Sequence, residues 1–172
     1  AVGMAVSESI LNKLFGNDIV NHYTYVLHGD GDIQEPVAQG SIACAGHWGL
    51  NKLIAYYDSN DAQISGKVSR SDSTDYVKMY ESHGWHVQEI DGHDHDQIRS
   101  AIRIAQMEVE KPSVIIGKTI MARGCDSVEH DHNTHGAPLS PEEIKNTKKK
   151  MGLNPDKFFD LPQEVLDDFR SS

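Results

Sequence analysis

An aspartate between two glycines, and an asparagine 30 residues further on, could together bind a metal ion and a phosphate. Gly29-Asp30-Gly31 ends the β-rich stretch HYTYVLHG, and Asn60 follows the apolar stretch LIAYYD. Glycines let a backbone approach a phosphate closely, and a helix predicted to follow would aim its N–H groups at the same point. Mg²⁺ that shares substrate phosphates needs only one or two such oxygen ligands. The spacing therefore predicts a Mg²⁺–diphosphate site, whereas the glycine-aspartate-glycine alone would favour a tight turn.

Histidines gather in two stretches of the sequence. DGHDHD contains His93 and His95, and EHDHNTH contains His130, His132 and His135. The first stretch lies in a predicted loop between a strand and a helix, where solvated side chains are more common than a zinc site. His135 lies in HGAPLS, on a long loop after a predicted strand, where a histidine can act as acid, base or hydrogen-bond donor. An ordinary surface histidine is the alternative for His135.

Helical and strand-like patterns alternate along most of the chain, which predicts an α/β fold with a parallel sheet covered on both faces. The predicted helices cover 1–16, 34–48, 73–83 and 94–111, and the predicted strands cover 22–29, 53–58, 86–90 and 113–120. Ligands of such sheets bind at the carboxyl ends of the strands. Asp30, Asn60 and the loop 121–138 should therefore lie at one edge of the sheet.

Apolar spacing also predicts which side chains face the core. In the helix 94–111 the inward residues should be Ile98, Ala101, Ile102, Ala105 and Met107 or Val109. Cys44, in the apolar run SIACAG, suits a buried small side chain. The predicted helix 34–48, which contains Cys44, has small apolar side chains at Ile42, Ala43 and Ala45. We expect this surface to favour self-association.

From Ser140 onward the pattern changes. Ser140 as N-cap, Pro141 at the first helical position and Glu143 three residues on predict a capped helix, and a short helix should follow Pro162. We expect the whole chain, 1–172, to be one domain, with 140–172 as the start of a tail or linker.

Composition excludes several classes of function. The formal net charge of −10 disfavours nucleic-acid binding, and no apolar stretch approaches the ~18 residues of a membrane span. Two cysteines without a Cys-x-x-Cys pair give no disulfide framework, which favours a reducing, cytoplasmic compartment. The first residues have no signal-peptide pattern. They look like a helix already under way, so we expect the chain to be a piece of a longer protein.

Taken together, these motifs resemble the transketolase family. AVGMA, GDG with Asn60 in YDSND, HGWHV, DGHD, KPSVIIGKTI and HGAPLS occur in the family's order. The GDG-to-asparagine signature is shared by thiamine-diphosphate enzymes broadly, while HGAPL and the tail NPDKFF resemble transketolase in particular. The resemblance covers essentially all 172 residues but only the family's diphosphate-binding domain, without its beginning.

The resemblance implies roles for particular residues. It makes Asp30, Asn60 and the backbone carbonyl of Ala62 the Mg²⁺ ligands, and it places Gly29 and Gly31 against the diphosphate. It places Glu35 in an acidic network at the dimer interface, and Ile64 and Met121 near the thiazolium ring. His135 would face the reactive carbon of the cofactor and the sugar substrate.

The resemblance also implies transfer of a two-carbon ketol unit from a ketose phosphate to an aldose phosphate, in the pentose phosphate pathway, with thiamine diphosphate and Mg²⁺. In the family a homodimer completes the site, and a partner's pyrimidine domain supplies the activating glutamate. That domain has no counterpart here, so we expect the chain alone to be inactive. A non-catalytic diphosphate-binding module remains the alternative; a deoxyxylulose-phosphate synthase is another, against which HGAPL argues.

Three positions depart from the family pattern. Pro36 replaces a glycine, Gly40-Ser41 replaces a glutamate-alanine pair, and Ala62 replaces a common isoleucine. Proline suits a first helical turn, and a carbonyl ligand does not depend on its side chain. None of these changes removes a metal ligand.

Overall fold

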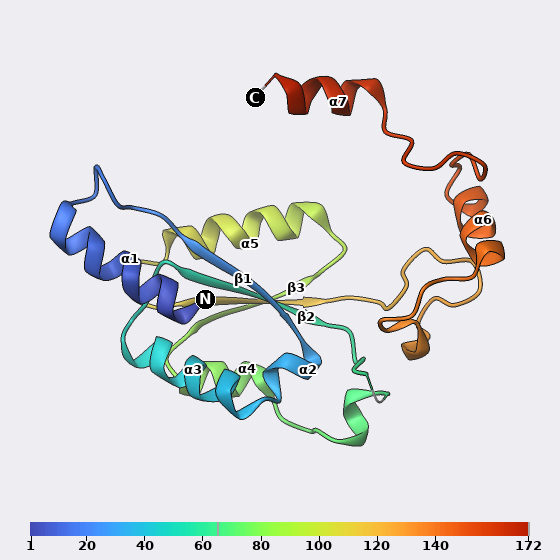
Figure 1. Cartoon of the computed structure of the whole chain (residues 1–172). Helices are drawn as coiled ribbons and strands as arrows, with labels where there is room; N and C mark the ends of the chain where they lie inside the picture. Colours follow the sequence, from blue (N-terminus) through green and yellow to red (C-terminus); the bar gives the residue numbers. More distant parts are fainter. Residues whose placement is uncertain (65, 172) are drawn as a thin grey trace. The chain divides into compact units, whose positions relative to one another are not determined.

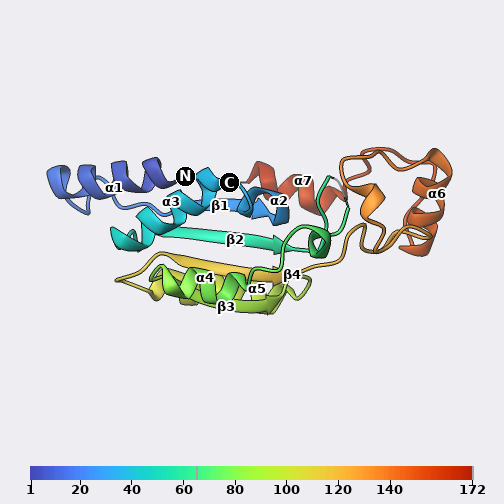
Figure 2. The same ribbon diagram turned by 90° about the horizontal axis from the view of Figure 1, so that it is seen from below.

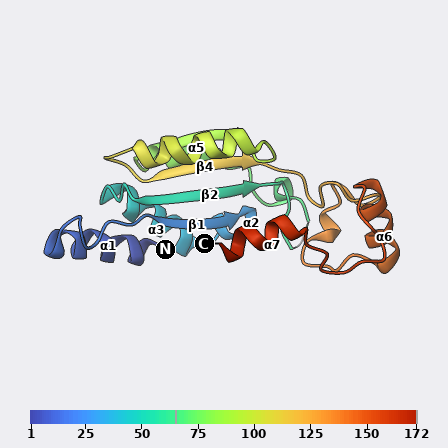
Figure 3. The same cartoon turned by 90° about the horizontal axis from the view of Figure 1, so that it is seen from above.

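Four parallel strands, in the order β1-β2-β4-β3, form the sheet of the computed structural model, which describes residues 1–64 and 66–171. The strands are β1 (Thr24–Gly29), β2 (Leu53–Ser59), β3 (His86–Asp91) and β4 (Ser113–Lys118). Figures 2 and 3 show β1, β2 and β4 side by side, with their arrows in the same direction. The register pairs Gly29 with Asp58 and Ser59 with Lys118, so these strands end at one edge.

Helices cover both faces of this sheet, as the alternating pattern predicted. α1 (Val2–Phe15), α3 (Pro36–His47) and α4 (Tyr76–Ser82) lie on one face, and α5 (His95–Met107) lies on the other (Figure 1). The α/β fold class predicted from the sequence is confirmed.

Strand β2 shows why two separate hydrophobic clusters form. Successive side chains of a strand point to opposite faces. Leu53, Ala55 and Tyr57 pack in the cluster under α1, α3 and α4, whereas Ile54 and the partly buried Tyr56 pack in the cluster with α5. The β2 residues 53–57 are therefore covered from both sides, which explains why the sequence reads as a continuous apolar run there.

The helix expected over 34–48 is confirmed as α3, and a short helix that was not expected precedes it. α2 (Asp30–Ile33) directly continues from β1, and α3 begins at Pro36. Glu35 between them is extended, with φ −70° and ψ 130°. A residue before a proline is driven out of the helical region, and Pro36 then occupies the first position of α3, where its missing N–H costs nothing.

The prediction for α3's faces was wrong in two respects. Ile42 and Ala45 lie in the core, with Ala45 fully buried, while Cys44 is exposed. At 100° per residue, 42 and 45 share one side of a helix and 44 turns away from it. Of the residues expected to favour self-association, Ile42 and Ala45 are therefore already covered, and only Ala43 is partly exposed.

Helix α5 also ends earlier than predicted. Ala101 and Ala105 are buried as expected, but Met107 and Val109 are 76% and 74% exposed. The helix stops at Met107 because Glu108 is extended, with φ −73° and ψ 123°. Val109 consequently falls outside the helical repeat on which its inward placement depended.

A second compact unit, residues 122–172, follows the first, which comprises residues 1–121. Its elements are η2 (His132–Thr134), α6 (Pro141–Lys150) and α7 (Gln163–Arg170), while η1 (Val68–Arg70) belongs to the first unit. The Ser140 hydroxyl caps α6 by accepting from the Glu143 N–H at 3.1 Å, as predicted. The predicted short helix after Pro162 is α7. That 140–172 leads into a linker stays a prediction.

No helix among the described residues is both long enough and apolar enough to cross a membrane.

Candidate functional site

Asp30 and Asn60 meet at the carboxyl edge of the sheet. Asp30 is the first residue after β1, and Asn60 is the first residue after β2. The backbone N–H of Asn60 donates to Asp30 Oδ2 at 3.0 Å. Parallel pairing of β1 with β2 produces this meeting, because it brings the ends of both strands to the same level.

The Asp30 carboxylate is only 4% exposed and has a hydrogen-bond donor on each oxygen. The hydroxyl of Tyr57 donates to Oδ1 at 2.5 Å, opposite the Asn60 N–H on Oδ2. Burial, followed by this hydrogen bond to Asp30, raises the pKa of Tyr57 well above its usual range. Tyr57 therefore keeps its proton and acts as a donor.

The amide of Asn60 is held at both ends. Its Nδ2 donates to Asp58 Oδ2 at 2.8 Å, and its Oδ1 accepts from the Ala62 N–H at 2.9 Å. Asp61 between them has φ 56°, a left-handed conformation that aspartate tolerates, and the turn brings Ala62 back towards Asn60. The hydroxyl of Thr119 in turn donates to the other oxygen of Asp58.

These oxygens fit a Mg²⁺ ion. Each Asp30 oxygen and Asn60 Oδ1 uses one lone pair on the hydrogen bonds just described, and an oxygen of this kind can accept at a second position. One carboxylate, one amide oxygen and the turn at Ala62 form a small set of hard ligands, which suits an ion that also binds phosphate. Among the residues that the structure describes, no three His, Cys, Asp or Glu side chains gather to form another metal site.

A cavity of about 350 Å³ opens beside Asp30 and Tyr57 within the first unit. Besides Asp30 its walls carry four carboxylates and one lysine, Lys118, whose Nζ lies 3.1 Å from Ser59 Oγ. The carboxylates are Asp61, Asp72, Asp75 and Glu89. This excess of negative charge favours a cation near the edge of the sheet.

Other residues that the sequence singled out lie around this edge. Gly29 is the last residue of β1, and Gly31 is exposed in α2, with open space where a Cβ would stand. Glu35 is exposed ahead of α3, Ile64 is 90% exposed, and Met121 is partly buried after β4. Their contacts with cofactor or partner subunit stay predictions.

His135 belongs to the second unit, where it is exposed and follows η2. The backbone N–H of His135 donates to the backbone carbonyl of His132 at 3.1 Å. The structure brings Asp30, Asn60 and Ala62 together; that His135 joins them stays a prediction.

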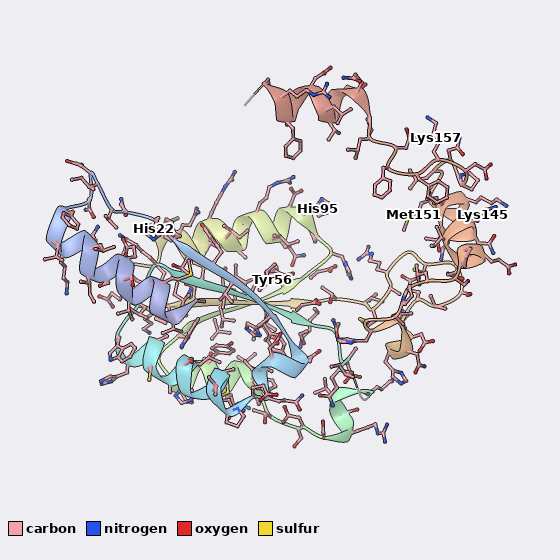
Figure 4. All side chains as sticks on the ribbon, in the orientation of Figure 1. His22, Tyr56, His95, Lys145, Met151 and Lys157 are labelled. Carbon is pink, nitrogen blue, oxygen red and sulfur yellow. The ribbon has the colours of Figure 1, made fainter. Side chains whose placement is uncertain are left out.

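His93, in the first unit, was expected to be solvated, but it is held by a hydrogen bond. Its Nε2 accepts from the backbone N–H of Ile120 at 2.9 Å, and this hydrogen bond is partly buried. His95 is exposed at the start of α5, as Figure 4 shows.

Sequence reasoning missed the residues that hold the predicted ligands. Tyr57 donates a hydrogen bond to Asp30, and Asp58 accepts one from Asn60. Thr119 donates to Asp58 and so supports Asn60 indirectly. A polar residue two positions before Asn60 was the available signal for Asp58. Tyr57 gave no such signal, because a tyrosine in an apolar strand reads as core.

Comparison with known proteins identifies the family. A family model described as the transketolase, thiamine diphosphate binding domain matches residues 1–172. Transketolase 2 of Vibrio parahaemolyticus is 43% identical over 96% of this chain, and the transketolase of Staphylococcus epidermidis is 41% identical over all of it. The chain spans about a quarter of these relatives, 25% and 26% of their lengths.

Solved structures agree with this assignment. The crystal structure of transketolase from Campylobacter jejuni superposes with a TM-score of 0.94 at 36% identity, over 98% of this chain and 26% of that one. Transketolase from Leishmania mexicana gives 0.93 at 38% identity, over 99% of this chain and 26% of that one. The chain therefore belongs to the transketolase family and matches that family's thiamine diphosphate binding domain.

Proposed function

We propose that these residues form the metal–diphosphate half of a transketolase active site. The enzyme would move a two-carbon ketol unit from a ketose phosphate to an aldose phosphate, within the pentose phosphate pathway, using thiamine diphosphate and Mg²⁺. The observation that carries the proposal is the meeting of Asp30 and Asn60, with the Asn60 N–H bonded to a buried carboxylate.

The residues present would divide the work as follows. Asp30, Asn60 and the Ala62 carbonyl would hold Mg²⁺, and Gly29 and Gly31 would leave room for the phosphates. The metal's charge would offset that of the diphosphate. When bound, thiamine diphosphate supplies the carbon nucleophile that carries the ketol unit, while the protein orients it and moves protons. His135 would be the proton-transferring group that faces the sugar.

The wider assembly is also part of the proposal. The remaining transketolase domains would complete the pocket around the pyrimidine and the sugar phosphate. A homodimer would bring the second half of each site, with Glu35 at the contact between subunits. A cytoplasmic location is supported by the two cysteines, both of them free.

A full-length transketolase chain that carries these residues tests the proposal. Asp30→Ala should abolish Mg²⁺-dependent retention of thiamine diphosphate and, with it, ketol transfer, because the central metal ligand is gone. Asp96→Ala, which removes an exposed acid of α5, is the matched control and should behave as the unsubstituted enzyme. Normal cofactor affinity and activity in the Asp30→Ala protein would refute the assignment. A diphosphate-binding module without enzyme activity would instead bind cofactor but show no transfer in any variant.

A further inference from the structure

Tyr57 reaches the proposed metal ligand from the core of the protein. It points to the face of β2 under α3 and α4 and is 3% exposed. Its hydroxyl lies 2.5 Å from Asp30 Oδ1, on the oxygen opposite the one that accepts from Asn60. A buried phenol needs a partner for its O–H, and here that partner is a residue with a proposed role.

The position of this hydroxyl is fixed by packing. The imidazole of His28 stacks on the Tyr57 ring with centroids 5.0 Å apart and an interplanar angle of 19°. Tyr76 meets the same ring edge-on at 5.7 Å and 86°. Aromatic contacts on two sides leave the Tyr57 ring little freedom, so the donor stands at a defined point.

A donor at this point determines how Asp30 presents its oxygens. With Tyr57 on Oδ1 and the Asn60 N–H on Oδ2, each carboxylate oxygen has one protein donor. Each oxygen keeps a second position at which it can accept or bind a metal ion. Removal of the hydroxyl would leave one carboxylate oxygen without its partner in a buried setting and would free the side chain to rotate.

We propose that Tyr57 is a positioning residue for Mg²⁺, one that acts through Asp30 without contacting the ion. The inference rests on the proposed function, since it assumes that Asp30 is a metal ligand. Outer-shell partners of this kind typically change metal affinity by about 10–100-fold when they are removed.

Tyr57→Phe in a full-length transketolase chain tests this, because the substitution keeps the ring and deletes only the hydroxyl. Tyr56→Phe is the matched control: it is the next residue of the same strand and packs on the opposite face, with α5 (Figure 4). Mg²⁺ is titrated in the presence of saturating thiamine diphosphate, and binding is followed by calorimetry. Tyr57→Phe should weaken Mg²⁺ binding by about 10–100-fold, and Tyr56→Phe should leave it unchanged.

A second measurement separates positioning from folding. A purely structural loss would lower the melting temperature of Tyr57→Phe without metal but leave the Mg²⁺ dissociation constant unchanged, and that result would overturn the inference. Equal weakening by Tyr56→Phe would overturn it as well. Asp30→Ala is included to separate the two proposals. If Asp30→Ala abolishes Mg²⁺ binding and Tyr57→Phe has no effect, only the role of Tyr57 fails; if Asp30→Ala has no effect, the proposed metal site itself fails.

Discussion

Asp58 fixes the orientation of the Asn60 side-chain amide. Its carboxylate can only accept a hydrogen bond, so the Nδ2 of Asn60 must face it and the Oδ1 must face away. We predict that Asp58→Asn weakens Mg²⁺-dependent cofactor retention, because an asparagine at 58 can accept or donate and so permits a flipped Asn60. The loss should approach about 10-fold at most, the low end for an outer-shell change, since the Ala62 N–H still favours the present orientation. Equilibrium dialysis of cofactor at fixed Mg²⁺ measures it, with Asp96→Asn as control. Unchanged retention would contradict the account of Asp58.

His135 has a prediction of its own. In a full-length transketolase chain, His135→Ala should lower turnover by about 10²-fold or more, the usual contribution of a proton-transferring group. Cofactor binding should persist, because the metal ligands are untouched. His130→Ala, on the same loop and also exposed, serves as control in steady-state kinetics. Undiminished turnover would return His135 to the class of surface histidines.

The ligand pair Asp30 and Asn60 could be predicted from the sequence because strand ends and their polar residues leave a local pattern. Asp58, only two residues before Asn60, also left a local signal. Tyr57 did not, because it contacts Asp30 only when β1 and β2 pair with Gly29 opposite Asp58. That register depends on contacts between segments far apart in the chain. So does the hydrogen bond to Asp58 from Thr119, which directly follows β4.

Helix α3 packs tightly against the turn that follows α4. A Cβ on Gly46 would overlap the backbone carbonyl of His83, whereas a Cβ on Gly40, in the same helix, would meet nothing within 4 Å. Gly46→Ala should destabilise the fold by about 1–3 kcal/mol or more, because backbone cannot give way as a side chain can. Gly40→Ala should be neutral or stabilising by up to ~1 kcal/mol, through lower unfolded-state entropy. Urea unfolding compares the two, and equal stability of both variants would refute the close packing.

Helix α1 is joined to the start of β2 by an ion pair. Lys52 Nζ lies 2.6 Å from Glu8 Oε1, and the two side chains are 21% and 4% exposed. Glu8→Ala should destabilise the fold by less than the ~3–5 kcal/mol of a fully buried pair, because Lys52 is partly solvated. The double variant Glu8→Met, Lys52→Met should recover most of that loss, since no unpaired charge remains. A double variant no more stable than Glu8→Ala in urea unfolding would contradict this reasoning.

Helices and strands were predictable in kind and order, while their ends were not always so. The break before α3 follows from Pro36 and could have been read from the sequence. The end of α5 at Met107 could not, because the residues after it, Glu108 and Val109, carry no strong stop signal before Pro112. The outward turn of Cys44 depends on which side of α3 meets the sheet, a matter of packing that a short apolar run leaves open.

The 172-residue chain by itself should catalyse no ketol transfer. Its relatives are about four times as long, and the proposed function assigns the pyrimidine end of the cofactor to one of the remaining domains. Contacts with the diphosphate end alone are few, and they must offset the entropy lost on association, so we expect the isolated chain to bind the cofactor weakly. The purified chain is assayed with thiamine diphosphate, Mg²⁺, a ketose phosphate and an aldose phosphate. Transfer above background, with full-length contaminant excluded, would show that the other domains are dispensable.

The location of the metal is the most direct test of the whole account. A full-length transketolase chain carrying these residues is crystallised with thiamine diphosphate and with Mn²⁺ in place of Mg²⁺, and anomalous scattering locates the ion. The account predicts a peak coordinated by Asp30 and Asn60 side-chain oxygens and the Ala62 carbonyl, with the diphosphate beside Gly31. A cofactor-bound crystal whose metal peak lies away from Asp30 and Asn60 would contradict it.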